Sequence, residues 1–167
     1  IVSSETLLLS SSSKVNFIIN FLQTIQHPQD KEALLDCLYF LHSHSKIQQE
    51  KHQFISDFIR LEQQQFYSEL NSYGLFFELS KFHQKPFYEK VEEIIRSFQL
   101  IQASDAYVQF FLDVVLEQQR KGTSIQEFLD FWEDKKEILS IVAPAAKNAV
   151  QVMTIHKSKG LEFPVVI

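Results

Sequence analysis

The residues most able to do chemistry lie together in one polar turn near the end of the sequence, His156-Lys-Ser-Lys-Gly-Leu-Glu162. Apolar runs rich in β-branched residues flank this turn and favour strands on both sides of it. The turn contains two lysines, a carboxylate and a glycine, at which the backbone can approach a ligand closely. A strand that leads into such a turn commonly presents its donors and cations to phosphate groups.

Single residues of this segment suit separate parts of a nucleotide or nucleic-acid site. Thr154 and His156 can donate hydrogen bonds to phosphate oxygens, which positions a strand without reading its sequence. Glu162 can accept hydrogen bonds from ribose hydroxyls, as acidic residues do in other nucleotide sites. Without a wider pattern, a His-Lys-Ser-Lys-Gly turn is more often an ordinary solvated loop, so the interpretation depends on the residues around it.

The wider pattern resembles motif V of the UvrD/Rep-type superfamily-one DNA helicases, whose core reads Thr-Ile/Leu-His-x-Ser/Ala-Lys-Gly-Leu-Glu-Phe. The resemblance implies that Glu162 and Gly160 belong to the ATP-binding site and that Thr154 and His156 face DNA. It assigns Lys159 and Ser158 to the polar network of the motif. The positions that fit are Thr154, Ile155, His156, Ser158, Lys159, Gly160, Leu161, Glu162 and Phe163.

A second resemblance concerns the order of segments before motif V. In these helicases a helical subdomain is inserted into the second motor domain, and it starts with an apolar segment, a helix and Asn/His-Pro-x-Asp. Leu7-Leu-Leu9, the helical pattern at 15–25 and His27-Pro-Gln-Asp30 follow that order. The Arg-Gly-Ile-Gly turn usual in the UvrD/Rep insert does not occur. With Pro164 after Phe163, this points to the RecB/AddA branch, helicases of recombination and double-strand-break processing.

Several sequences that such a helicase needs are absent from these 167 residues. There is no Gly-x-x-x-x-Gly-Lys-Ser/Thr phosphate loop, no Asp-Glu metal box, no arginine-bearing motif VI and no nuclease signature. The resemblance therefore implies that ATP and Mg²⁺ are bound mostly by residues outside this chain and that the isolated fragment holds neither. No catalytic residue is expected within it, and we expect it alone neither to hydrolyse ATP nor to unwind DNA.

Apolar residues recur at helical spacing through most of the chain, and only 3 glycines and 4 prolines interrupt it. The pattern predicts a mainly α, multi-helix domain of about seven helices with short β segments at both termini. Asp30 and either Ser104 or Asp105 are expected N-caps, and Thr123-Ser-Ile-Gln-Glu127 is expected to be a capping box. The helices are expected at residues 15–25, 30–41, 47–70, 75–82, 86–98, 105–120 and 123–132.

The switch from helical to strand periodicity near residue 150 divides the chain. On the resemblance, residues 1–12 are a strand stub and loop of the second motor domain, and 13–140 are the inserted helical subdomain. Residues 141–149 are then a linker, and 150–167 are the motif V strand–turn–strand. The missing initiator Met and the end within an apolar run lead us to expect a piece of a longer protein. An unpaired apolar edge at 150–167 could pair with Ile1-Val2 or with a second copy of the chain.

Composition narrows the class of protein. Apolar residues make up 45% and charged residues 22%, which is typical of a globular domain. A net charge of −5 argues against a nucleic-acid binder that uses its whole surface, although not against a local cationic site. No stretch is apolar enough for a membrane span. The single cysteine, Cys37, is expected to be a buried small hydrophobe in a reducing compartment, and the parent protein is expected in a bacterial-type cytoplasm.

Two other groups of residues favour a structural interpretation over a functional one. His42, His44 and His52 are close in sequence, but the first two, at i,i+2, do not share a helix face, so a metal site is disfavoured. The aromatic and basic residues at 81–88 offer base stacking in principle. Exposed ends of helices that face the core are the simpler account of them.

The sequence therefore predicts a fragment of an ATP-dependent DNA helicase or translocase that acts in recombination and repair. Its expected partners are single-stranded and duplex DNA and a helicase/nuclease partner subunit, and a nuclease domain in the parent is left open. The fragment itself is expected to contribute DNA or partner contacts and motif V coupling between nucleotide and DNA. The alternative is a non-catalytic helical interaction module of a helicase relative that has lost its motor.

Overall fold

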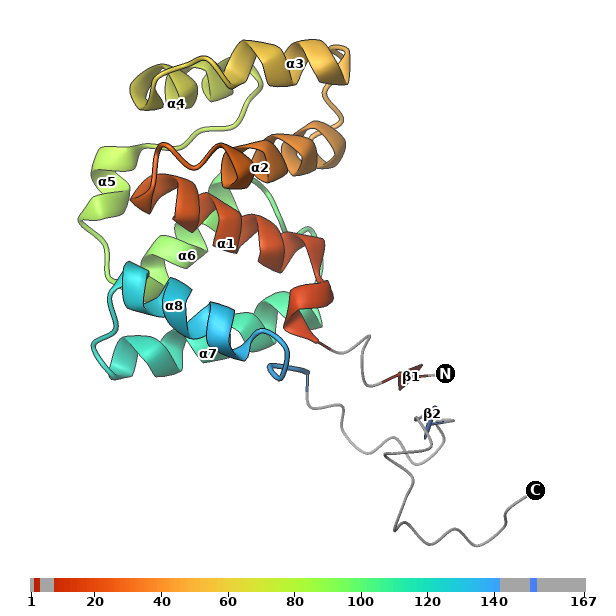
Figure 1. Ribbon diagram of the computed structural model, residues 1–167, viewed down its shortest axis with the longest axis vertical. Helices are drawn as coiled ribbons and strands as arrows, with labels where there is room; N and C mark the ends of the chain where they lie inside the picture. The colour runs from red at the N-terminus through yellow and green to blue at the C-terminus, as the bar shows by residue number, and fades with distance from the viewer. Residues whose placement is uncertain (1, 4–7, 142–150, 153–167) are drawn as a thin grey trace, which may run out of the picture.

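Eight α-helices make up most of the part of the chain that the computed structural model describes, which comprises residues 2–3, 8–141 and 151–152 (Figure 1). The predicted mainly α fold class is therefore confirmed. A short 3₁₀-helix, η2 (Leu9–Ser11), precedes the α-helices. These are α1 Ser13–Gln26, α2 Lys31–His44, α3 Lys51–Phe58, α4 Gln63–Ser72, α5 Leu79–His83, α6 Phe87–Ser97, α7 Ala106–Arg120 and α8 Ile125–Lys135.

Side-chain caps fix the starts of several helices. Ser12, Asp30 and Asp105 each accept a hydrogen bond from the backbone N–H three residues further on, at the starts of α1, α2 and α7. A capping box opens α8 as predicted, and Ser124 and Glu127 form it. Each cap satisfies an N–H group that has no partner inside its own helix. The predicted caps Asp30 and Asp105 are thus confirmed.

The prediction of one helix at 47–70 is wrong, because two helices, α3 and α4, occupy this stretch. The described residues therefore form eight α-helices where about seven were predicted. The chain turns after Phe58, whose carbonyl accepts from the Leu61 N–H (3.1 Å). Glu62 then caps the new helix α4, and its N–H donates to the Gln65 side chain (3.4 Å). The break lets the rings of Phe58 and Phe66 meet edge to face with centroids 5.5 Å apart. In one straight helix their positions would be separated by about 12 Å along the axis.

The helix predicted at 75–82 is shorter than expected, because only the five residues of α5 are helical there. Gly74, at φ +75°, ends the preceding helical segment in a conformation that glycine adopts without strain. After it, Leu75 and Phe77 are buried while Phe76 is 68% exposed. This alternation is that of extended backbone, which places both Leu75 and Phe77 on the core.

Helix α1 lies at the centre of the core. It packs against α2, α6, α7 and α8, and Figure 1 shows it between α2 and α8. Its Phe17 and Phe21 side chains are almost completely buried. The Phe21 ring lies 4.7 Å from that of Phe98 and 5.0 Å from that of Phe77, in both cases edge to face. These contacts join α1 to the end of α6 and to the extended segment before α5.

Both ends of the helical body leave it at one place, which we call the stem and define as residues 8–9 and 139–140. The Leu9 N–H donates to the Leu139 carbonyl (2.8 Å), and Leu8 and Ser140 form an antiparallel bridge. Leu9 is also buried in the core, so the stem is part of the folded body.

Beyond the stem, two-residue strands pair in parallel: β1 (Val2–Ser3) and β2 (Gln151–Val152) (Figure 1). The β segments predicted at the two termini are seen only as these residue pairs. The rest of their predicted length lies outside the described residues.

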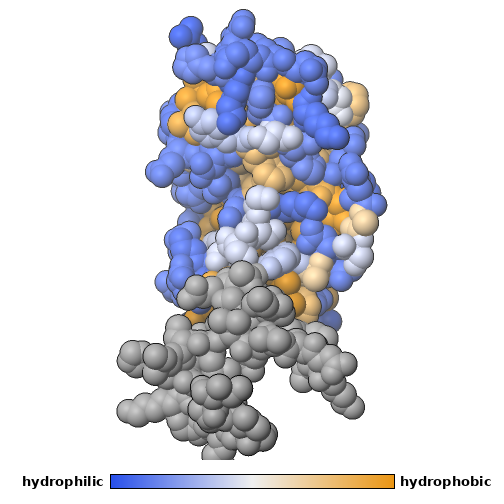
Figure 2. All heavy atoms as spheres, turned by 90° about the vertical axis from the view of Figure 1, so that its right-hand side faces the viewer, coloured by the Kyte–Doolittle hydropathy of each residue, from blue (hydrophilic) through white to orange (hydrophobic). Residues whose placement is uncertain are grey.

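On the face shown in Figure 2, the surface of the helical body is mostly hydrophilic, with smaller apolar patches between. Large apolar side chains exposed on the described part of the chain are Tyr39, Phe76 and Ile138. None of the described helices combines the length and the apolarity that crossing a membrane requires.

Phe21 and Phe76 provide a matched pair of substitutions that tests this core. Phe21→Ala removes a ring that is fully buried among other rings, so it should lower the free energy of unfolding by about 3–5 kcal/mol. Phe76→Ala removes a ring that is 68% exposed and should change that free energy by no more than about 0.5 kcal/mol. Urea unfolding followed by circular dichroism measures both values. Equal losses would contradict this placement of α1 and of the segment before α5.

Candidate functional site

The candidate site predicted from the sequence begins directly after β2. Its residues lie outside the described part of the chain: Thr154, His156, Ser158, Lys159, Gly160 and Glu162. The structure does describe the strand that leads to them, in which Gln151 and Val152 pair with Val2 and Ser3. In α/β sheets, ligands bind beyond the carboxyl ends of parallel strands, and Thr154 is the second residue after such an end.

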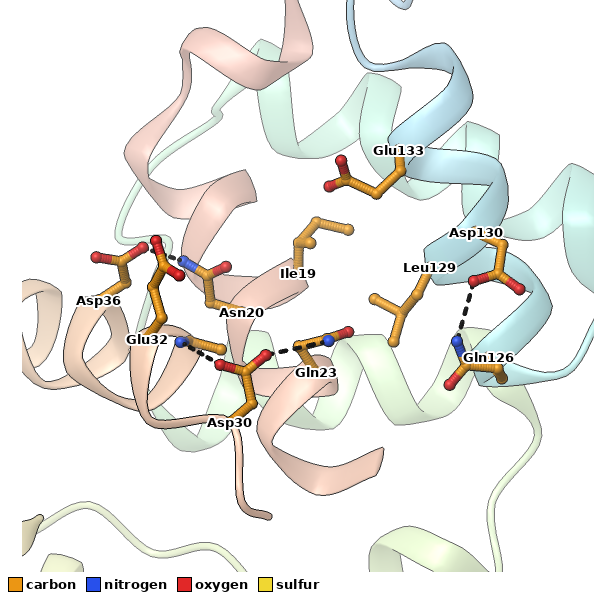
Figure 3. Close-up of a pocket in the computed structure, with 11 residues that line it drawn as sticks. Ile19, Asn20, Gln23, Asp30, Glu32, Asp36, Gln126, Leu129, Asp130 and Glu133 are labelled. Atoms are coloured by element: carbon orange, nitrogen blue, oxygen red, sulfur yellow. Dashed lines mark hydrogen bonds between the residues drawn. The ribbon is translucent and has the colours of Figure 1, made fainter. Parts of the chain in front are cut away.

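The described body has a hollow of about 320 Å³ between α1, α2 and α8 (Figure 3). Figure 3 shows carboxylates of α2 and its cap on one side and those of α8 on the other, with Ile19 and Leu129 between them. Sequence reasoning missed this hollow because its two sides are about a hundred residues apart in the chain. The carboxylates that line it are Asp30, Glu32, Asp36, Asp130 and Glu133.

Amide side chains donate hydrogen bonds to three of these carboxylates. Asn20 donates to Asp36 (3.3 Å), Gln23 to Asp30 (3.2 Å) and Gln126 to Asp130 (3.0 Å). Within the described residues, no three His, Cys, Asp or Glu side chains converge closely enough to hold a metal ion. The hollow is therefore an anionic surface that repels phosphate.

Charge is divided unevenly between the helical body and the predicted site. Residues 8–141 contain 13 lysines and arginines and 19 aspartates and glutamates, a net charge of −6, whereas residues 142–167 contain three lysines and one glutamate, a net charge of +2. Five lysines of the body also form ion pairs with carboxylates: Lys14, Lys81, Lys85, Lys121 and Lys136. Of the three lysines at 142–167, Lys157 and Lys159 follow β2 and lie within the predicted turn.

The turn that carries the second resemblance, His27-Pro-Gln-Asp30, joins three helices. Asp30 caps α2 through the Ala33 N–H (3.0 Å), and a His27 ring nitrogen lies 2.8 Å from the Gln126 side-chain oxygen on α8. The hydrogen bond from Ala33 is the main cause that holds the pKa of Asp30 below its ordinary value, against the opposing effect of partial burial. The turn therefore has a structural role in fixing α2 against α1 and α8.

In the stretch 81–88 the two phenylalanines face the core while Lys81 and His83 are exposed, which agrees with exposed ends of helices that face the core. Phe82 and Phe87 are buried, so their faces are not open to a base. Lys85 pairs with Glu93 (2.6 Å), and the Lys90 ammonium lies 5.7 Å from the centroid of the Phe82 ring.

Two further predictions concern Cys37 and the histidines. Cys37 is completely buried, as predicted, and burial raises the pKa of its thiol. The ring nitrogens of His42 and His44 contact different backbone carbonyls, those of Gln49 (2.8 Å) and Gln99 (3.2 Å).

Comparison with known proteins bears on most of the chain. The family described as UvrD-like helicase C-terminal domain matches residues 11–167. A 34-residue stretch is 56% identical to an ATP-dependent helicase/nuclease subunit of Streptococcus pneumoniae (strain Hungary19A-6). That stretch is 20% of this chain and 3% of the length of that protein. No solved structure matches the chain.

The Asp30 cap gives a test that depends on pH. Because the pKa of Asp30 is lowered in the folded state, its stabilising effect is complete above the ordinary aspartate pKa and is lost as the pH falls through the folded value. Asp30→Ala should therefore lower the free energy of unfolding by about 1 kcal/mol at pH 7, and the difference from the natural protein should shrink below about pH 4.

Asp130→Ala, in the same hollow but at no helix start, is the control, because it removes a carboxylate without removing a cap. Urea unfolding at pH 7 and pH 3 measures the difference. A constant deficit for Asp30→Ala across that range would show that the carboxylate charge does not stabilise α2.

Proposed function

The chain belongs to the UvrD-like helicase C-terminal domain family, and from that premise we propose that it is part of an ATP-dependent DNA helicase. Residues 13–140 are the helical subdomain inserted into the second motor domain, with the 1–12 segment before it. The 141–149 linker and the motif V segment at 150–167 follow it. The observation that carries the proposal is the stem, where both ends of the helical body leave side by side.

The pairing beyond the stem supports the insertion. Parallel neighbours in a sheet need a long crossover between them, and here the whole helical body is the connection between β1 and β2. A body with adjacent ends can be inserted at such a crossover without separating the two strands. The sheet of a motor domain would then continue on either side of this pair.

In this proposal the residues after β2 couple nucleotide binding to DNA binding. Glu162 accepts hydrogen bonds from the nucleotide ribose, and Gly160 allows close approach of the backbone at the same site. Thr154 and His156 donate to the DNA backbone, while Lys159 and Ser158 hold the turn in shape. In this proposal ATP and its Mg²⁺ are bound mostly by residues outside this chain.

The parent's wider role follows from the relative named above. That streptococcal protein, by its name, combines helicase and nuclease activities and is one component of an assembly. We extend this to the parent of the present chain, as a helicase of the RecB/AddA branch that acts in recombination and repair with a nuclease domain and a partner subunit. With DNA as the substrate, the bacterial cytoplasm is its place of action.

The acidic surface of the helical body bears on which partner the helices contact. With a net charge of −6 across residues 8–141, the helices are better suited to contacts with a partner subunit than to gripping duplex phosphates. The same feature suits the alternative function, a non-catalytic interaction module of a helicase relative without a working motor. Hydrolysis of ATP by the parent protein separates the two.

Glu162→Ala in the full-length parent tests the proposal. Loss of a hydrogen bond to a charged group costs about 1.5–3 kcal/mol, so kcat/KM for ATP should fall about 10- to 150-fold. Glu137→Ala, which removes an exposed carboxylate after α8, should leave kcat/KM unchanged. Steady-state ATP hydrolysis with single-stranded DNA measures both variants, and circular dichroism checks that helical content is intact.

An unchanged kcat/KM in Glu162→Ala would remove that residue from the nucleotide site. A parent protein with no ATP hydrolysis at all would leave the non-catalytic module as the function.

A further inference from the structure

A groove between α1 and α2 combines aromatic rings with polar side chains and a cation. It encloses about 610 Å³ and is lined by four rings, those of Phe17, Tyr39, Phe40 and His44. Its other lining side chains are polar, and none is aliphatic. An apolar anchor of a partner protein normally fills a well-packed apolar pocket, which this groove does not offer.

The rings form a stack that runs from the core to the surface. The Phe17 and Phe40 rings are 4.6 Å apart at 21°, and the Phe40 and His44 rings are 5.0 Å apart at 15°. Phe17 is buried, whereas Phe40 and His44 are half-buried, so the stack reaches the groove at the imidazole. Tyr39, which also lines the groove from α2, is 47% exposed. A flat aromatic ligand can continue such a stack at little cost in ordering.

The cation of this groove is Lys51, which contacts an aromatic ring and, in the described part of the chain, no carboxylate. The Lys51 ammonium lies 5.0 Å from the centroid of the Tyr39 ring, and no carboxylate pairs with it among the described residues. An exposed cation–π contact is worth only about 0.5–1 kcal/mol, so this ammonium can turn to a phosphate. The neighbouring Glu50 carboxylate caps α3 through the Gln53 N–H (2.9 Å).

The remaining polar groups suit the edge of a base. Asn16, Asn20 and Ser43 line the groove. Asn16 donates to the Ser10 carbonyl (2.8 Å) and Ser43 to the Tyr39 carbonyl (3.2 Å). The side-chain oxygens and the second N–H of each amide can still bond to a base. Asp36, its one carboxylate, accepts from the Asn20 amide (3.3 Å) and lies where the groove meets the acidic hollow. A phosphate would therefore lie toward Lys51 and away from Asp36.

We propose that this groove binds a nucleotide of single-stranded DNA, with the base stacked against Tyr39 and His44 and the adjoining phosphate at Lys51. The proposal rests on the proposed function, which supplies DNA as the ligand. A duplex does not fit, because its bases are already stacked and its dense phosphates would meet a body of net charge −6. The groove thus gives the helical body a single-strand contact separate from that of motif V.

The test uses the 167-residue chain and a fluorescein-labelled oligonucleotide of twelve thymidines, with binding followed by fluorescence anisotropy. Tyr39→Ala should weaken binding about 5- to 150-fold, which is the loss expected for one base–aromatic stack. Tyr39→Phe should restore affinity to within about twofold, because the ring is kept. Phe76→Ala, which removes another exposed ring outside the groove, should have no effect.

Two further measurements separate base from phosphate. On an abasic oligonucleotide of the same length, Tyr39→Ala should bind as the natural chain does, because no base remains to stack. Lys51→Ala should reduce the slope of log K against log salt by about 0.7, the value for one phosphate contact in a single strand. Lys135→Ala, an exposed lysine of α8, should leave the slope unchanged.

The proposal is overturned if the chain does not bind the oligonucleotide, or if Tyr39→Ala binds it like the natural chain. It is also overturned if Tyr39→Ala abolishes binding of a partner subunit while DNA binding persists, because the groove is then a protein contact. None of these results bears on Glu162, whose test is ATP hydrolysis by the parent, so the two proposals fail separately.

Discussion

The backbone pairing at the stem, between Leu9 and Leu139 and between Leu8 and Ser140, is the constraint on which the rest of the structure depends. It brings together two residues that are 130 positions apart in the sequence, so the segment with the eight α-helices begins and ends at the same place. Joining the two ends costs chain entropy, and the burial of apolar side chains of α1 among the other helices offsets that cost. The strands beyond the stem can then pair without any contribution from the helices.

This closure separates two kinds of chemistry in one chain. The helical body has its own core and an acidic surface, on which five lysines are paired to carboxylates. The segment after β2 carries the glycine, the hydroxyls and the cations that suit a nucleotide and a DNA backbone. In the proposed helicase, changes in the helical body would therefore leave the proposed nucleotide-binding groups unchanged.

Helix α1 and the caps at Asp30, Asp105 and Ser124 could be predicted from the sequence because periodicity and capping are local. The break between α3 and α4 was missed, since Leu61 fits the helical spacing. In the structure the Glu62–Gln65 capping box and the contact of Phe58 with Phe66 accompany the turn. The residues that resemble motif V were identified from their order alone, and their roles stay a prediction. The acidic hollow and the aromatic groove were missed because packing of separate helices creates both.

The most direct test of the insertion is to replace residues 9–139 in the parent protein with a four-residue Gly/Ser loop. Since Leu8 and Ser140 are already paired antiparallel, a short hairpin loop can join them. The measurement is the affinity of the shortened protein for a fluorescent ATP analogue. An affinity within about threefold of the natural value, equivalent to less than about 1 kcal/mol, is the predicted result. Loss of ATP binding with loss of folded structure would show that the helical body is part of the motor's own core.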